Sequence, residues 1–268
     1  PLAEVAERIM RHAPESFESY DDHTLSVALK VLPRLVRRMK GNAIRLAFQF
    51  LPEAWMALTG GLPKLVLIAE FTAATGEEAE AAALAARDAL SGMGLKTNVT
   101  KSEAEGEKYW TIRRESFNLL RQHVKHLRTA PFIDDFVVRR EDLSAFLPEL
   151  YEVLGTYPKM VFTVAGHVGD GNFHIIPLMD VRLPETESII RDLAEKVYAL
   201  VIRYGGSITG EHNDGIIRTP FVGRMFGAEI ERLFGETKEL FDPLRVFNPG
   251  KKVGGEFGYA MGHLDLIA

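Results

Sequence analysis

The order of hydrophobic and polar residues divides the chain into stretches with a helical period and short apolar runs. Three stretches of the first sixty residues have a helical period: 2–11, 24–39 and 43–58. The pair Gly60-Gly61 then breaks the pattern. After it, an apolar run predicts a buried strand over 64–71, and an Ala- and Glu-rich stretch predicts a helix over 77–93.

The rest of the chain alternates apolar runs with amphipathic stretches. Strands are predicted at 95–100, 132–138, 160–166, 172–179 and 207–209, and helices at 103–127, 143–154, 187–204 and 229–240. Strands and helices in the order βαβ and then βαββαβ are typical of ferredoxin-like units around antiparallel sheets. The pattern therefore predicts an α+β fold, with a doubly wound parallel sheet as the alternative.

The pattern also suggests three parts. Residues 1–61 form a helical N-terminal segment, 62–240 form the ferredoxin-like α+β domain, and 241–268 form a C-terminal arm. The arm contains the proline-rich stretch 241–251, which has no helical period and carries aromatic residues. We therefore expect the arm to pack its hydrophobic side chains on a partner surface.

Composition excludes several classes of protein. Fractions of 46% hydrophobic and 26% charged residues are typical of globular proteins and exclude disordered and collagen-like chains. The formal net charge of −5 argues against a nucleic-acid partner, because phosphate contacts need a clustered basic surface. The longest apolar run, 65–69, is too short for a transmembrane segment, and the N-terminus lacks a secretory signal. We therefore expect a cytoplasmic protein.

The chain contains no cysteine, which excludes disulfides, thiolate nucleophiles and iron–sulfur ligation within it. Any metal ion must therefore bind to His, Asp, Glu or Asn side chains. The chain begins at Pro1 and continues directly into an amphipathic stretch. We expect it to be processed or to be part of a longer protein.

The stretch 165–174, Ala-Gly-His-Val-Gly-Asp-Gly-Asn-Phe-His, is the most unusual in the sequence. It places His167 and His174 around glycines that allow a tight turn between two predicted strands. Such a turn can bring both imidazoles to the same end of a sheet. Alternatively, the stretch is a hairpin tip whose polar residues only satisfy the turn.

A second polar stretch, Thr-Gly-Glu-His-Asn-Asp-Gly at 209–215, follows the last predicted strand. Functional residues often lie on such loops, because a rigid sheet can position them. Adjacent Glu211 and His212 offer a carboxylate and an imidazole that point in different directions. The alternative is a turn capped by Asn213 and Asp214.

Together, His167, His174 and Glu211 form a set of two imidazoles and one carboxylate. This is the ligand type of catalytic zinc and of other divalent first-row metals, and three protein ligands leave positions open for a substrate. A metal in such a site polarises a bound hydroxyl group. His212 is then suited to be the general base, because an imidazole can accept a proton at neutral pH.

Three motifs occur in a fixed order: Gly-His-x-Gly-Asp-Gly-Asn-x-His at 166–174, Gly-Glu-His-x-Asp-Gly at 210–215, and Phe-Asp-Pro-x-x-x-x-Asn-Pro-Gly-Lys at 241–251. In this order they resemble the C-terminal domain of FAD-linked oxidases. That family contains the glycolate oxidase large subunit, D-lactate dehydrogenases and D-2-hydroxyglutarate dehydrogenases. Arg218 and Phe221 are most similar to the branch in which this domain is fused to an iron–sulfur segment.

The resemblance implies an FAD-dependent dehydrogenase that oxidises the 2-hydroxyl group of a D-2-hydroxy acid by metal-assisted deprotonation and hydride transfer. FAD would be bound mainly by a separate N-terminal domain, so this polypeptide alone should not turn over. His167, His174 and Glu211 match the ligands of a divalent metal, which is zinc, manganese or iron. His212 matches the catalytic base.

Two further residues match functional positions of the family. Arg113 matches an arginine that grips the substrate carboxylate, for which a guanidinium offers paired donors. Asn248 lies in the segment that returns to the flavin domain and is expected to contact the cofactor. The expected partners are a small 2-hydroxy acid and the flavin domain of the same protein, with an iron–sulfur domain or subunit as a further candidate. Peripheral attachment to the inner membrane is the alternative to a purely cytoplasmic full-length protein.

Two departures from the family pattern bear on the function. Asn213 replaces a usual glycine, although Asn tolerates the left-handed backbone conformation better than most residues. It favours the alternative of a non-catalytic metal- or partner-binding module with the same fold. Ile133 lies near the position of a lysine in the 2-hydroxyglutarate branch, so a second substrate carboxylate is not implied. A metal-dependent hydrolase, with His212 as the base for a metal-bound water, is another alternative.

Overall fold

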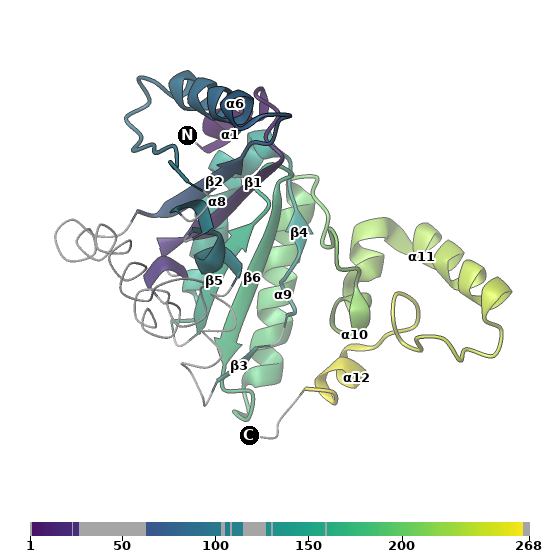
Figure 1. The fold of residues 1–268 in the computed structure, drawn as a ribbon. Helices are drawn as coiled ribbons and strands as arrows, with labels where there is room; N and C mark the ends of the chain where they lie inside the picture. Colours follow the sequence, from purple (N-terminus) through teal and green to yellow (C-terminus); the bar gives the residue numbers. More distant parts are fainter. Residues whose placement is uncertain are drawn as a thin grey trace. The chain divides into compact units, whose positions relative to one another are not determined.

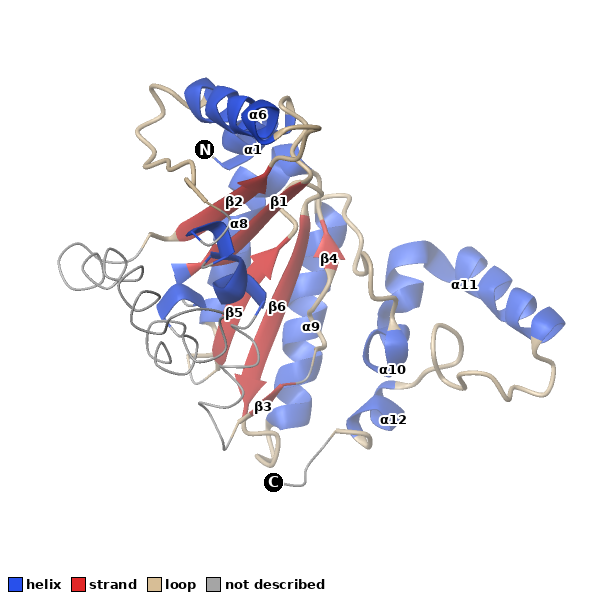
Figure 2. Cartoon of the chain, in the orientation of Figure 1, coloured by secondary structure: helices blue, strands red, loops and turns tan. Residues whose placement is uncertain are grey.

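An antiparallel sheet joins the six strands of the computed structural model, which describes residues 2–22, 24–26, 63–102, 105–107, 109–114, 127–129, 131–158 and 160–264 (Figure 1). The strands are β1 (Ser16–Asp21), β2 (Leu65–Glu70), β3 (Arg128–Thr129), β4 (Phe136–Val137), β5 (Val161–Gly166) and β6 (Asn172–Met179). Their hydrogen-bonded order is β2-β1-β5-β6-β3, and β4 also pairs with β6. Together with the helices (Figure 2), this sheet confirms the predicted α+β fold and argues against a doubly wound parallel sheet.

The chain passes several times between two compact units. The first unit comprises Pro1–Lys125, Arg140–Ala145 and Phe162–His174, and the second comprises His126–Arg139, Phe146–Val161 and Ile175–Ala268. Strand β6 continues from the first unit into the second between His174 and Ile175. The division into 1–61, 62–240 and 241–268 that the sequence suggests stays a prediction.

Strand β1 is central to the first unit. It pairs with β2 along its whole length, from Ser16 opposite Glu70 to Asp21 opposite Leu65, and it also pairs with β5. Because a strand lies on each side of it, β1 is buried from its second residue onward, and this includes the polar Glu18. Strand β1 was not predicted from the sequence.

Two helices of the first unit, α1 (Leu2–Met10) and α6 (Gly76–Ala89), contact each other. Helix α1 buries one apolar face, made of Val5, Ala6 and Ile9. Helix α6 begins with a capping box, in which Thr75 accepts a hydrogen bond from the Glu78 backbone and donates its own backbone N–H to the Glu78 carboxylate. A cap of this kind stabilises a helix by about 1 kcal/mol.

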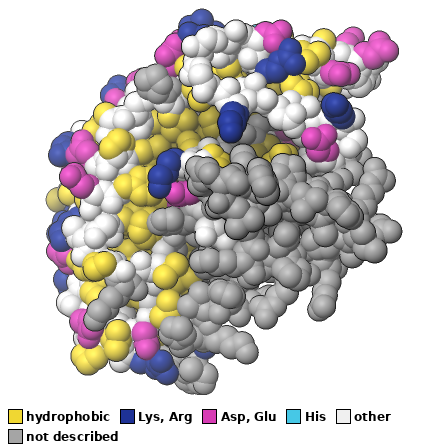
Figure 3. All heavy atoms as spheres, turned by 90° about the vertical axis from the view of Figure 1, so that its left-hand side faces the viewer, with side chains coloured by type: hydrophobic (Ala, Val, Ile, Leu, Met, Phe, Trp, Pro, Cys, Tyr) yellow, Lys and Arg dark blue, Asp and Glu magenta, His cyan; other side chains and the backbone are white. Residues whose placement is uncertain are grey.

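Strand β2 is the last strand in the order of the sheet, and this position explains its exposure. The run 64–71 was predicted to be a buried strand, but Leu65 to Ala69 are only half-buried. On the face of the molecule that Figure 3 shows, hydrophobic side chains gather in a patch. An edge strand has a neighbour on one side only, so its side chains lose less contact with solvent.

The second unit is built around α9 (Thr186–Arg203), whose buried face runs the length of the helix. Its members are Thr186, Ile190, Leu193, Ala194, Val197, Tyr198, Leu200 and Val201. The hydroxyl group of Tyr198 donates a hydrogen bond to the backbone carbonyl of Phe132, and its ring contacts Phe221 edge to face, with ring centroids 5.1 Å apart. These contacts place the segment before β4 against α9.

The remaining elements of the described chain are the 3₁₀ helices η1 (Arg140–Asp142) and η2 (Thr219–Phe221), and the helices α8 (Leu143–Gly155), α10 (Gly215–Arg218), α11 (Val222–Phe241) and α12 (Phe257–Met261). Helix α11 is kinked at Gly227, which has φ 78° and ψ 163°. After α11 the chain continues into the C-terminal arm, whose first part, 242–252, contains no helix or strand. Side chains at the end of α11 and in the arm are at least 67% exposed, namely Leu240, Phe241, Leu244, Val246 and Phe247.

The helices predicted at 2–11, 77–93, 143–154 and 187–204 and the strands β2 and β5 agree with the structure to within a few residues, and β6 has the predicted bounds of 172–179. The prediction of a strand at 95–100 is wrong, because these residues pair with no strand of the described chain. The predicted strand 207–209 is reduced to one bridge, between Ser207 and Val137.

The predicted strand 132–138 is reduced to the two residues of β4. Asp135 adopts a left-handed conformation, with φ 64°, and this interrupts the extended backbone. The predicted helix 229–240 is longer than expected and begins at Val222 as α11.

Some predicted helices lie mainly outside the described residues. These are 24–39 and 43–58, together with 103–127, of which 105–107 and 109–114 are described and helical. Within the described chain, no helix is both long enough and apolar enough to cross a membrane.

Candidate functional site

The hairpin between β5 and β6 brings the two predicted histidines together. His167 follows β5, and its backbone carbonyl accepts hydrogen bonds from the N–H groups of Asp170 (2.9 Å) and Asn172 (3.2 Å). Gly166 is required here, because a Cβ at this position would lie 2.2 Å from the carbonyl oxygen of Asn172. The rings of His167 and His174 are edge to face, with centroids 5.4 Å apart.

Glu18 connects two predicted site residues. One carboxylate oxygen lies 2.5 Å from Nδ1 of His167, and the other accepts a hydrogen bond from Nε of Arg113 at 3.2 Å. Because a carboxylate only accepts, Nδ1 of His167 carries the proton. Histidines that bind metals are commonly oriented by a carboxylate in this way. Glu18 lies within a strand and belongs to no motif, so the sequence alone does not point to it.

Glu211 and His212 follow the bridge at Ser207. The Glu211 carboxylate lies 3.0 Å from Nε2 of His212, and the two side chains are 46% and 56% exposed. The backbone N–H groups of Gly210, Glu211 and His212 all donate to the carboxylate of Asp135, at 2.9 to 3.0 Å. The predicted carboxylate and the predicted base therefore lie on a loop that surrounds a buried aspartate.

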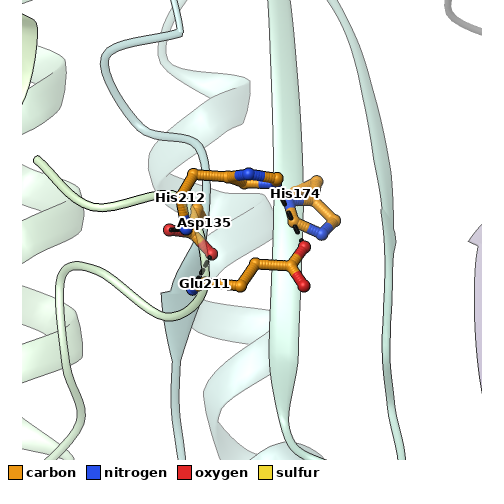
Figure 4. Close-up of side chains that lie close together, drawn as sticks. All are labelled: Asp135, His174, Glu211 and His212. Atoms are coloured by element: carbon orange, nitrogen blue, oxygen red, sulfur yellow. Dashed lines mark hydrogen bonds and ion pairs between the residues drawn. The ribbon is translucent and has the colours of Figure 1, made fainter. Parts of the chain in front are cut away.

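Four side chains are close enough to hold one metal ion (Figure 4). Ligand atoms of Asp135, His174, Glu211 and His212 all lie within 4.8 Å of one another. His174 lies on β6, Asp135 directly precedes β4, and Glu211 and His212 follow the bridge at Ser207. His167, the remaining predicted ligand, is not a member of this group and instead lies beside His174.

The donors in the group fit a divalent first-row metal. Two imidazoles and a flexible, half-exposed carboxylate are the ligand types that such ions select. Asp135 differs from the others, since it is fully buried and its oxygens already accept hydrogen bonds from the loop.

Asn213 takes the conformation that a glycine would take. Its φ is 60°, and its side-chain oxygen accepts a hydrogen bond from the backbone of Asp214 at 2.8 Å. Asparagine is among the residues that adopt this conformation at small cost. The backbone therefore accommodates the asparagine locally.

Two other predicted residues are not members of the metal-binding group. Arg113 contacts Glu18 and is mostly buried. Asn248 is exposed in the arm, where its side-chain oxygen accepts a hydrogen bond from Nζ of Lys251 at 3.3 Å. Lys252 fixes the first part of the arm, because its ammonium group pairs with the buried Asp214 carboxylate at 2.6 Å.

Comparison with known proteins agrees with these motifs. Residues 2–252 match the family model described as FAD linked oxidases, C-terminal domain. A D-2-hydroxyglutarate dehydrogenase from Pseudomonas putida is 28% identical over 251 residues, which are 92% of this chain and 23% of the relative. A D-lactate dehydrogenase from Archaeoglobus fulgidus is 28% identical over 230 residues, which are 85% of this chain and 47% of that protein.

A glycolate oxidase subunit from Bacillus subtilis is 25% identical over 160 residues, which are 60% of this chain and 33% of the subunit. In each comparison, the chain spans less than half the length of its relative. The family match covers both compact units and all three motifs. The chain therefore belongs to the family of C-terminal domains of FAD linked oxidases.

Proposed function

We propose that this chain is the substrate- and metal-binding domain of an FAD-dependent dehydrogenase for D-2-hydroxy acids of the D-lactate, glycolate or D-2-hydroxyglutarate type. The observation that carries the proposal is the group formed by His174, Glu211 and His212, together with His167 beside His174. Relatives with dehydrogenase names support the reaction class.

In this proposal, His167, His174 and Glu211 hold a divalent metal, and His212 is the base. When bound, the metal supplies a Lewis acid for the substrate's 2-hydroxyl group, and FAD supplies the acceptor for hydride from C2. His212 takes the hydroxyl proton, for which its half-exposed imidazole is accessible. The contact with Glu211 keeps this imidazole beside the metal-binding carboxylate.

Arg113 is proposed to bind the substrate carboxylate. Its guanidinium has five donors in a planar fork, and a carboxylate can accept from two of them. Glu18 engages Nε and so fixes the plane of the guanidinium. The same carboxylate contacts His167, so that one buried group sets the orientation of a substrate-binding residue and of a metal ligand.

The exposed arm is proposed to face a flavin-binding domain. Its hydrophobic side chains are largely exposed, and Asn248 lies among them. An iron–sulfur domain or subunit is a further candidate partner. The cytoplasmic location stays a prediction.

Metal binding by variants tests the proposal. The purified chain is expected to bind about one equivalent of Zn²⁺ or Mn²⁺ in a competition titration. His174→Ala and Glu211→Gln should each lower the affinity at least tenfold, because each replaces a ligand with a poorer one or with none. His212→Asn should retain the metal.

His263→Ala is the control, since this exposed histidine hydrogen-bonds only to Tyr259 among the described residues and should not affect binding. If the double variant His167→Ala, His174→Ala binds the metal unchanged, the site lies elsewhere. If His212→Asn loses the metal while Glu211→Gln keeps it, the proposed roles of the two neighbours are exchanged.

A further inference from the structure

We infer that Asp135 is a positioning residue that holds Glu211 and His212 in place, and that it is not itself a metal ligand. The inference rests on the proposed metal site, but it concerns a residue to which neither the motifs nor the family match give a role. Asp135 is fully buried, and it lies in the left-handed region, with φ 64°. Its side chain is surrounded by hydrogen-bond donors.

Five donors point at the two oxygens of Asp135. Oδ1 accepts from the backbone of Glu211 at 2.9 Å, and Oδ2 accepts from the backbones of Gly210 and His212 at 3.0 and 2.9 Å. Two side chains, Thr209 at 3.4 Å and Arg218 at 3.2 Å, also donate to Oδ2. Four of the five donors converge on Oδ2, which has only two lone-pair sites, so this oxygen is committed to the loop and to Arg218.

Arg218 completes the arrangement. Its guanidinium is also buried, and it pairs with Asp135, so that neither charge is buried alone. The same guanidinium donates to the backbone carbonyls of Asp134 and Asn213. The loop from Gly210 is therefore held by Asp135 at its start and by Arg218 at its end.

This arrangement acts on the site through the backbone. Three consecutive N–H groups that point at one carboxylate fix the backbone of Gly210, Glu211 and His212. The side chains of Glu211 and His212 are about half exposed, so packing constrains them little. The directions in which they leave the backbone therefore depend on Asp135.

Cobalt binding distinguishes a positioning residue from a ligand, because the visible absorption of bound Co²⁺ reports its ligands. In the 268-residue chain, Asp135→Asn should lower the Co²⁺ affinity by about 10- to 100-fold, as is usual for residues that orient ligands. At saturating Co²⁺ its spectrum should match that of the unaltered chain. A changed spectrum would mean that Asp135 binds the metal, and an unchanged affinity would mean that it does not position the loop.

Asp242→Asn is the matched control. Asp242 is also buried and accepts two backbone N–H groups, but it does so in the arm, and its substitution should leave Co²⁺ binding unchanged. Glu211→Gln tests the underlying site separately. If it binds Co²⁺ as tightly as the unaltered chain, the proposed function is wrong whatever the result for Asp135.

A measurement without substitution covers the case in which Asp135→Asn does not fold. The amides of Gly210, Glu211 and His212 should be protected from hydrogen exchange, although the loop side chains are exposed. Adding Zn²⁺ should preserve this protection. If Zn²⁺ instead abolishes it, Asp135 has turned from the loop to the metal and the inference fails.

Discussion

At the scale of single residues, Glu18 and Asp135 are buried carboxylates that contact residues of the candidate site. The sequence predicted His174, Glu211 and His212, because each lies in a short, glycine-containing motif. Glu18 and Asp135 could not be found in this way. Glu18 contacts Arg113 and His167, which are 95 and 149 residues away in the sequence. Spacing within a motif contains no information about such pairs.

Substitution of Glu18 should weaken the metal site without removing a ligand. Glu18→Gln replaces the carboxylate beside Nδ1 of His167 with a neutral amide, which orients the imidazole less strongly. We expect the Zn²⁺ affinity of the chain to fall about tenfold in a competition titration. Glu70→Gln, on the edge strand, is the control and should bind normally. Equal affinities for both variants would show that Glu18 does not act on the metal through His167.

At the scale of elements, amphipathic helices and apolar strands could be predicted, whereas β1 could not. Its sequence, Ser-Phe-Glu-Ser-Tyr-Asp, is mostly polar, yet nearly all of it is buried. The burial is possible because the polar groups have partners: Asp21 accepts from the backbones of Val164 and Thr24, and Ser19 donates to the Gly166 carbonyl. Tertiary hydrogen bonds of this kind override the local hydrophobic pattern.

The stability of the turn from Asp242 to Phe247 should depend on pH, because the Asp242 carboxylate accepts hydrogen bonds from the backbone of Val246 and Phe247. The hydrogen bond from Lys238 lowers the pKa of this carboxyl, and the backbone N–H groups of Val246 and Phe247 lower it further, against the opposing effect of burial. The ionised form is thus favoured in the folded arm. The ionised Asp242 carboxylate therefore stabilises the turn fully above its ordinary pKa of 3.8, and this stabilisation is lost as the pH falls through the lowered pKa.

An NMR titration of the Val246 and Phe247 amide protons measures this effect. We expect both resonances to move together in acid, with a midpoint below 3.8. In Asp242→Asn the shift should be absent, because no carboxyl group titrates beside these amides. A midpoint at or above the ordinary value would show that Asp242 does not hold the turn as an ionised acceptor.

At the scale of the whole molecule, the three motifs predicted the family, but the two compact units could not be predicted. The chain crosses from one unit to the other at residues 126, 140, 146, 162 and 175. None of these positions is marked by a linker or a change of composition. The motif 165–174 and the loop 209–215 are far apart in the sequence. Strand β6 carries His174, and the loop after Ser207 carries Glu211 and His212.

The cofactor binding of the whole chain provides the last prediction. A flavin dinucleotide needs backbone N–H groups at its pyrophosphate, commonly from a glycine-rich turn that opens a helix, and no Gly-x-Gly-x-x-Gly motif follows a strand in this sequence. We therefore expect the purified 268-residue chain to be colourless and to bind no stoichiometric FAD, while it still binds Zn²⁺ through His174 and Glu211. Visible absorption and a titration with FAD measure the first property, and the competition titration measures the second. A chain that retains one equivalent of flavin through purification would show that these residues contain a flavin site of their own, and the assignment of the flavin to another domain would be wrong.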